Sequence, residues 1–200
     1  MNAGAETWVR GPLGGRVSGP RRGTVLKYGG SLLVRPAWPA ELRTLVAHLA
    51  SPVTVVVGGG PVVDGLRTLD AAVPQPDELA HRLAIDALGL TARIVAAALG
   101  APLSPLPNPA GTAVLEVAAW LADDDEGGRL PVGWQVTSDS IAARVAMKTD
   151  RGLLLAKSVA PPVDGADLAA LAAAGWIDGH FPQAARGLAT IGWATPRRPS

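Results

Sequence analysis

The hydrophobic positions of the chain gather into short continuous apolar runs that predict buried strands. The clearest runs are 24–28 (TVLKY), 53–57 (VTVVV) and 152–156 (GLLLA). A continuous apolar run of this length is typical of a strand buried on both faces of a parallel sheet. Residues 188–193 are a further candidate strand.

Between these runs, apolar residues recur at helical spacing. The longest helical pattern covers 77–99, where Asp77 can cap the start and Gly100 ends the helix. Further helices are expected at 39–50, after 60 to about 70, from 140 to about 148, at 164–174 and at 181–187. Residues 101–112 read as irregular, 113–121 fits either a strand or a helix, and 123–126 (DDDE) reads as a solvated turn.

Strands that alternate with helices through short glycine loops predict an α/β fold, a three-layer αβα sandwich around a mainly parallel central sheet. Residues 1–22 contain five Gly, two Pro and four Arg without periodicity, which predicts a flexible and dispensable N-terminal tail. We therefore expect 23–200 to form a single domain.

The composition limits the function classes. The 200 residues are 48% hydrophobic and 18% charged, which is typical of a globular chain. No apolar run approaches the ~18 residues that cross a bilayer, and the first residues lack the apolar region of a secretory signal. Without cysteine, the chain has no disulfide, thiolate metal site or cysteine nucleophile. Three separated histidines give no metal-site spacing, so we expect a cytoplasmic protein with no bound metal centre and no membrane contact.

The charges carry a more specific signal. Eighteen Lys+Arg against 17 Asp+Glu give a net charge of +1, without a basic block that would favour nucleic acid. Of these cations only Lys27, Lys148 and Lys157 are lysine. Lys27 and Lys157 each end an apolar strand-like run, and a compact, flexible cation suits a moving phosphate better than the planar fork of arginine. The alternative is the chance survival of a few lysines.

Two of the predicted strands end in glycine clusters that open helices, at 27–31 (KYGGS) and 57–61 (VGGGP). Glycine lets backbone N–H groups approach a ligand, and a helix N-terminus adds partial positive charge. Two such loops at the carboxyl ends of parallel strands are typical of a polyphosphate cradle. Neither is a Walker A loop or a G-x-G-x-x-G fingerprint, and a tight strand-to-helix turn explains each cluster as well.

A third motif, TSDS at 137–140, precedes an apolar helix. One interpretation is helix capping, with Ser138 or Asp139 accepting backbone N–H groups. The other is a functional carboxylate that holds a lysine in place or helps to coordinate Mg²⁺.

The order of these motifs resembles that of the amino acid kinase superfamily, over residues 24 to about 187. The motifs are VLKYGGS, then VVVGGG followed by Arg67 and Asp70, and then TSDS. The segments 80–85 (AHRLAI), 134–140 (WQVTSDS) and 177–182 (IDGHFP) are similar to the short branch that acts on aminomethyl-furanmethyl phosphate in methanofuran synthesis.

The resemblance implies an αβα sandwich that transfers the γ-phosphoryl of ATP, with Mg²⁺, to an oxyanion of a small-molecule acceptor. By this resemblance Lys27 stabilises the transferring phosphoryl, and Asp139 organises the lysines. The implied nucleotide contacts are Gly29, Gly30, Ser31 and Lys157, and the implied acceptor contacts are Gly58, Gly59, Gly60, Arg67, His81 and Ser138.

The sequence departs from the superfamily pattern after the strand at 152–156. Many members read T-D-V-D-G there, whereas this chain reads Ala156-Lys157-Ser158-Val159. Either Lys157 contacts phosphate or the usual nucleotide contacts are missing. A non-catalytic binding protein that keeps the fold is therefore a rival hypothesis. His81 is open between a substrate contact and a hydrogen-bonded boundary histidine, and the apolar helix at 77–99 favours a homodimer.

Overall fold

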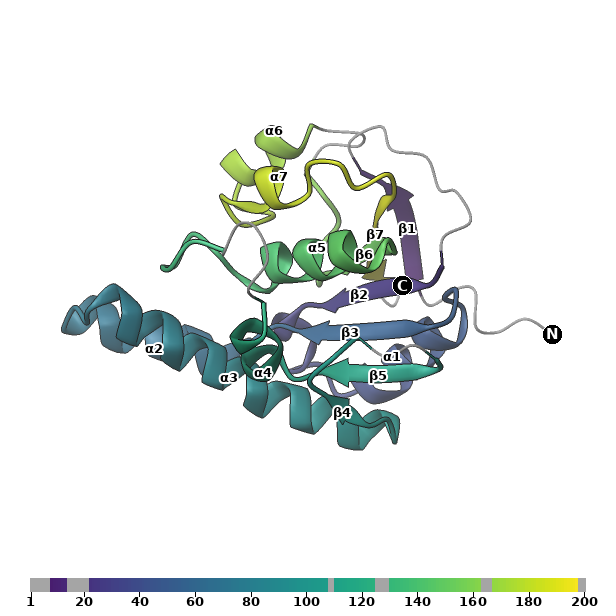
Figure 1. Cartoon of the computed structure of the whole chain (residues 1–200), viewed down its shortest axis with the longest axis horizontal. Coiled ribbons are helices and arrows are strands. Elements are labelled where there is room, and N and C mark those ends of the chain that lie inside the picture. The colour runs from purple at the N-terminus through teal and green to yellow at the C-terminus, as the bar shows by residue number, and fades with distance from the viewer. Residues whose placement is uncertain (1–7, 14–21, 108–109, 125–129, 163–166, 198–200) are drawn as a thin grey trace.

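A computed structural model describes residues 8–13, 22–107, 110–124, 130–162 and 167–197 (Figure 1). Within these residues a seven-stranded sheet has the order β1-β7-β6-β2-β3-β5-β4, and all pairs are parallel except β1 with β7. The strands are β1 (Trp8–Pro12), β2 (Thr24–Tyr28), β3 (Val53–Val57), β4 (Leu103–Ser104), β5 (Thr112–Leu115), β6 (Gly152–Ala156) and β7 (Ile191–Pro196).

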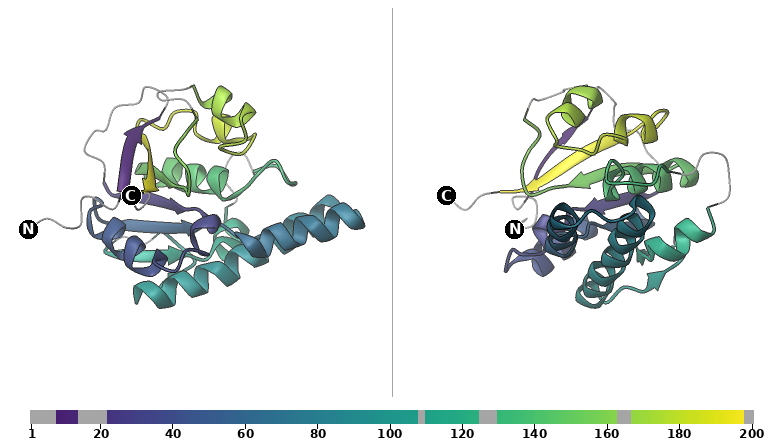
Figure 2. Two further views of the ribbon diagram at one scale, coloured as in Figure 1. Left: turned by 180° about the vertical axis from the view of Figure 1, so that it is seen from behind. Right: turned by 90° about the vertical axis from the view of Figure 1, so that its left-hand side faces the viewer.

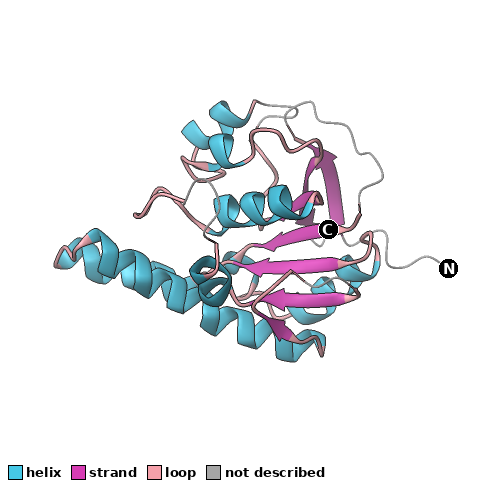
Figure 3. Ribbon diagram, in the orientation of Figure 1, coloured by secondary structure: helices cyan, strands magenta, loops and turns pink. Residues whose placement is uncertain are grey.

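Helices cover both faces of this sheet (Figure 2, Figure 3). They are α1 (Trp38–Ala47), α2 (Pro61–Ala72), α3 (Asp77–Leu99), α4 (Val117–Ala122), α5 (Ser138–Thr149), α6 (Leu168–Ala173) and α7 (Phe181–Ala184), with a 3₁₀ turn η1 (Gly30–Leu32) after β2. The expected three-layer αβα sandwich is confirmed.

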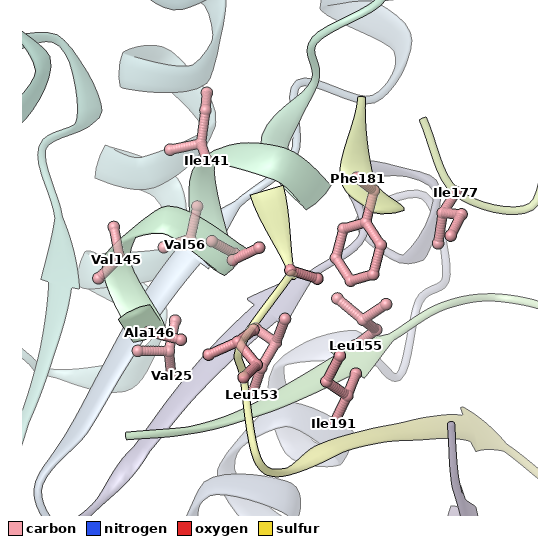
Figure 4. Packing of buried hydrophobic residues seen from close by; sticks show 14 of the residues in the cluster. Val25, Val56, Ile141, Val145, Ala146, Leu153, Leu155, Ile177, Phe181 and Ile191 are labelled. Carbon is pink, nitrogen blue, oxygen red and sulfur yellow. The ribbon is translucent and has the colours of Figure 1, made fainter. Parts of the chain in front are cut away.

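The two faces of the sheet bury separate hydrophobic clusters in the described part of the chain, because successive side chains of a strand point to opposite faces. Val25 and Val56 belong to the cluster under α5, where Phe181 also packs (Figure 4). Leu26 and Val55 belong to the other cluster, which α1 and α3 cover.

Several predicted elements have the expected bounds, including β2, β3, β6 and α3, and Gly100 ends α3 in the left-handed region with φ 62°. The expected cap by Asp77 is wrong, since Pro76 is the N-cap residue and no side chain caps this end. The segment 113–121 fitted either a strand or a helix, and it contains the end of the strand β5 and the start of the helix α4. The last strand, β7, begins three residues later than expected.

The prediction of a flexible tail over 1–22 is wrong for residues 8–13. Trp8–Pro12 pairs antiparallel with β7, and the backbone N–H of Leu13 donates to the carbonyl of Ile191 at 2.9 Å. Trp8 and Leu13 are buried, and the indole of Trp8 donates to the carbonyl of Glu41 at 3.1 Å. This segment therefore covers the edge of β7. Residues 1–7 and 14–21 lie outside the described residues, and the single domain over 23–200 stays a prediction.

The burial of Leu13 gives a direct test of this edge. Leu13 has no exposed surface, so Leu13→Ala is expected to destabilise the fold by about 2–5 kcal/mol through lost burial and a residual cavity. Val9 lies in β1, in the same edge segment, but is 39% exposed, so Val9→Ala is expected to cost under about 1 kcal/mol. Urea unfolding of both variants measures the difference, and equal costs would show that the segment does not pack as described.

The acidic run at 123–126 is also more than a solvated turn. Asp124 is buried and forms ion pairs with Arg144 and Lys148 of α5. The Nη2 of Arg144 lies 3.1 Å from Oδ1 of Asp124. Because two cations compensate the buried carboxylate, the chain after α4 is anchored to α5. Residues 125 and 126 lie outside the described residues.

Candidate active site

A cavity of about 240 Å³ opens where the carboxyl ends of β2, β3 and β6 meet the N-terminus of α5. In a parallel sheet these strand ends share one edge, which is where α/β folds bind ligands. The cavity brings together all the residues that the sequence nominated except Gly29: Lys27, Gly30, Ser31, Gly58, Gly59, Gly60, Arg67, His81, Ser138, Asp139 and Lys157.

Strand register directs the two lysines to the same face. Lys27 stands opposite Val56 and Leu155, whose side chains belong to the cluster under α5. Lys157 lies two residues beyond Leu155 and continues that alternation past the end of β6. Both ammonium groups can therefore reach the first turn of α5.

Asp139, in that first turn, forms an ion pair with each of the two lysines. Its Oδ1 lies 2.9 Å from Nζ of Lys27, and its Oδ2 lies 2.8 Å from Nζ of Lys157. The Asp139 residue is 3% exposed, and both lysine side chains are largely buried. One carboxylate thus holds two ammonium groups at the cavity wall and leaves an excess of positive charge.

This arrangement shifts the acid–base properties of the triad. Burial acts to raise the pKa of Asp139, but the charges of Lys27 and Lys157 outweigh it, so the pKa lies below the usual value and the group is a carboxylate at neutral pH. Burial and the charge of Lys27 lower the pKa of Lys157 to about 8. The charge of Lys157 therefore changes at mildly alkaline pH.

Trp176 also contacts the ammonium group of Lys157. The Nζ of Lys157 lies 5.0 Å from the centroid of the Trp176 ring, within cation–π distance. The indole N–H of Trp176 donates to the carbonyl of Val159 at 3.1 Å, which fixes the ring. No sequence pattern predicted that these two residues would pair, although Trp176 stands just before the 177–182 segment.

The two glycine loops pack directly against each other. A Cβ on Gly30 would lie 2.1 Å from the backbone N of Gly60, and Gly60 itself has φ 53°. Both positions therefore require glycine for loop packing, as the tight-turn interpretation holds. Their backbones also line the cavity, so the packing role and a ligand role coexist.

Gly29 differs from its neighbours. Its N–H donates to the carbonyl of Ala156 at 2.8 Å, and it does not line the cavity. This N–H ties the end of β2 to β6 and is not free for the phosphate contact that the family resemblance implied.

Arg67 and Trp134 line the same cavity and contact each other. The guanidinium of Arg67 stacks 5.2 Å from the centroid of Trp134 and pairs with Asp64 at 3.3 Å. The indole N–H of Trp134 donates to Asp70 at 2.9 Å. The Nδ1 of His81 accepts the backbone N–H of Gly133 at 3.4 Å while the residue lines the cavity. His81 is thus a hydrogen-bonded boundary residue that also faces the site.

Two solved kinase structures share this architecture. Uridylate kinase from Archaeoglobus fulgidus is 16% identical, with 86% of this chain and 99% of that chain covered and a TM-score of 0.54. UMP kinase from Ureaplasma parvum is 12% identical, with 87% and 99% covered and a TM-score of 0.60. The chain has the amino acid kinase-like fold. No protein-family model matches the sequence, and neither does any curated protein.

The TSDS motif lies at the start of α5, as expected. The residue that caps the N-terminus of α5 differs from the expected one. Thr137 is the N-cap residue, and its Oγ1 accepts the N–H of Asp139 at 3.3 Å. Neither Ser138 nor Asp139 acts as the cap. The N–H of Ser140 donates instead to the carboxylate of Asp178 at 3.0 Å. Asp178 lies 38 positions after Ser140 in the chain, and the sequence analysis did not single it out as a site residue.

The described residues offer no preformed metal centre on this fold, because no group of three His, Asp or Glu side chains converges in that part of the chain. Both oxygens of Asp139 face lysines, so the expected alternative of a direct Mg²⁺ ligand does not fit this carboxylate. Asp64 is the other carboxylate among the described lining residues, and its side chain is 69% exposed.

None of the described helices is both long and apolar enough to cross a membrane.

Proposed function

We propose that the chain is a small-molecule kinase that transfers the γ-phosphoryl of ATP to a carboxylate, carbamate or phosphate oxygen. The observation that carries the proposal is the pair of buried ammonium groups, Lys27 and Lys157, held by Asp139 beside two glycine loops. Phosphoryl transfer needs positioning and charge neutralisation more than covalent chemistry. A wall with two cations for one buried carboxylate meets that need.

Each residue has a distinct role in this proposal. Lys27 neutralises charge on the transferring phosphoryl, and Lys157 contacts the phosphates of the nucleotide. Asp139 holds both ammonium groups in place through its two ion pairs. The Gly30 and Gly60 loops present backbone to the phosphates at the same edge of the sheet. The excess positive charge of the wall fits an anionic ligand such as a nucleotide, and Mg²⁺ arriving with that nucleotide would add to the neutralisation of phosphate charge.

The acceptor is proposed from the Arg67–Trp134 pair in the cavity lining and from the resemblance of three segments to the methanofuran branch. Arg67 offers a cation beside the flat apolar surface of Trp134. This pair suits an acceptor with an anionic end and a flat body, such as aminomethyl-furanmethyl phosphate. A phosphorylation screen over carboxylate, carbamate and phosphomonoester acceptors tests this choice.

The rival, a non-catalytic binding protein, is favoured by one observation. Among the described residues, none that follows Lys157 in the sequence lines the cavity. Lys157 and the glycine loops could contact the phosphates of a nucleotide. For the nucleoside, the described residues after Lys157 offer no lining side chain.

Thermal unfolding with Mg·ATP separates the two functions. ATP at ~100 times its dissociation constant is expected to stabilise the wild type by ~2.7 kcal/mol. Lys157→Met is expected to lose most of this shift and to bind the acceptor nearly as before. Lys148→Met is the matched control, because Lys148 pairs with Asp124 away from the cavity. No shift of the wild type at millimolar ATP would favour the non-catalytic protein.

The cytoplasmic location and the homodimer stay predictions. Four large apolar residues of α3 are exposed, as the homodimer would require: Leu79, Leu83, Leu90 and Ile94. Figure 1 shows α2 and α3 lying side by side and extending beyond the sheet.

A further inference from the structure

Asp178 is the centre of a hydrogen-bond network at the start of α5. Within the described part of the chain its carboxylate accepts six hydrogen bonds, three at each oxygen. Oδ2 accepts from the N–H of Thr137 at 2.9 Å, its hydroxyl at 2.8 Å and the N–H of Ser140 at 3.0 Å. Oδ1 accepts from the hydroxyl of Ser140 at 2.5 Å and from the N–H groups of His180 at 3.1 Å and Phe181 at 2.8 Å.

These bonds fix the backbone on both sides of Asp139. Thr137 and Ser140 bracket it, and each is bound through both its backbone and its side chain. The hydroxyl of Thr137 donates to Asp178 and also accepts the N–H of Asp139. Asp139 therefore has little freedom to move relative to Lys27 and Lys157. Two carboxylates at one helix N-terminus are also favoured by the helix dipole.

The remaining bonds connect this turn to a second element. The N–H of Phe181 begins α7, and the Phe181 ring is buried under α5 among the core residues of Figure 4. The carboxylate of Asp178 thus joins the first turns of α5 and α7. It makes no ion pair with either lysine in the described structure, so it can act on the cavity only through the residues that it holds and through its charge.

We propose that Asp178 is a positioning residue that holds Asp139 at the midpoint between Lys27 and Lys157. The inference rests on the proposed kinase function. A carboxylate that shifts by about 1 Å would leave one lysine poorly placed, and misplacement on this scale can cost up to ~10²-fold in rate. The loss would fall on the transition state, where the phosphoryl charge is greatest, and much less on ground-state binding.

The charge of Asp178 gives a second, independent readout. Lys157 faces Lys27 on β2, Asp139 on α5 and Asp178 before α7. Among these, Asp139 and Asp178 act to raise its pKa, against burial and the charge of Lys27. Replacing Asp178 by the isosteric amide removes one of the two raising charges, so the pKa of Lys157 should fall below about 8. The alkaline limb of the rate profile then moves to lower pH.

Asp178→Asn tests the proposal, because the amide keeps the shape but cannot accept at both ends. We expect kcat to fall about 10–100-fold with KM for ATP within about threefold. In parallel, protein labelled with ¹³C-lysine has three side-chain signals, from Lys27, Lys148 and Lys157. A pH titration of these signals is expected to show a lower pKa for Lys157 in the variant. This second measurement does not depend on kinase activity.

Asp124→Asn is the matched control, since Asp124 also anchors α5 through buried ion pairs but does not line the cavity. It should leave both kcat and the titration of Lys157 unchanged. If Asp178→Asn is not folded, Ser140→Ala removes one bond to Asp178 and keeps its charge, and should lower kcat without moving the Lys157 titration. Wild-type kcat in Asp178→Asn, or an equal kcat loss in Asp124→Asn, would overturn the proposal. An inactive wild type with the expected Lys157 shift would instead overturn the kinase function.

Discussion

Lys27→Ala is expected to lower kcat by about 10²–10³, or roughly 2.7–4 kcal/mol of transition-state stabilisation, and to leave KM within a few-fold. The Nζ of Lys27 lies at the cavity wall, 2.9 Å from Asp139, where it can meet charge that develops on the phosphoryl. An interaction that strengthens in the transition state raises kcat and has little effect on ground-state binding. Steady-state kinetics with ATP and the best acceptor measure the effect.

Two further variants sharpen this result. Lys27→Arg should recover little activity, because the larger planar guanidinium cannot occupy the same largely buried point beside Asp139. Lys148→Ala removes the lysine that pairs with Asp124 outside the cavity, and should keep wild-type kcat. Full activity in Lys27→Ala would end the kinase assignment in its present form.

Asp139→Asn is expected to reduce both activity and stability. The change leaves two buried ammonium groups without their shared counter-ion, and breaking a buried pair in this way typically costs about 3–5 kcal/mol. Because Lys27 also loses its anchor, kcat should fall nearly as far as in Lys27→Ala. The double variant should be little worse in kcat than either single one, since the two residues act as a unit.

The stability loss should depend on pH in a defined window. The pKa of Asp139 is lowered in the fold, so its contribution is present above the unfolded value of about 4 and is lost as pH falls through the folded pKa. On the alkaline side, Lys157 loses its charge through about pH 8, and its attraction to Asp139 is lost with it. The free-energy difference between wild type and variant should therefore be largest between about pH 4 and 8.

Chemical unfolding of wild type and Asp139→Asn at pH 3, 6 and 9.5 measures that profile. Thr137→Ser is a useful control, because it keeps the capping hydroxyl beside Asp139 and leaves the charges unchanged. A difference that is constant over the three pH values would mean that the two lysines do not compensate Asp139 as described.

Part of this site could be predicted from sequence because its components are local. Lys27 directly follows apolar residues of a buried strand, and the glycines follow each strand within a few positions. Local order of this kind fixes which residues reach the carboxyl edge of a parallel sheet. The motif resemblance then associated Lys27 with Asp139, and the structure brings their side chains to 2.9 Å.

The six hydrogen bonds of Asp178 could not be predicted in this way. Thr137 and Ser140 lie 41 and 38 positions before Asp178 along the chain. One of the two interpretations of TSDS placed the helix cap on the nearest candidates, Ser138 or Asp139. Backbone N–H groups at a helix start donate to any acceptor that packing brings near, so the choice of acceptor is made by tertiary structure.

The sequence by itself determined the elements whose hydrophobic pattern is complete within a short segment, namely β2, β3, β6 and α3, and with them the layered fold. Only the tertiary structure decided that residues 8–12 are a strand, since they have no periodic apolar pattern and gain order by pairing with β7. The same holds for Asp124, whose acidic neighbours favour solvent but whose carboxylate is buried by Arg144 and Lys148. Local propensity specifies backbone conformation, whereas edge pairing and buried charge depend on which distant groups the packed chain brings into contact.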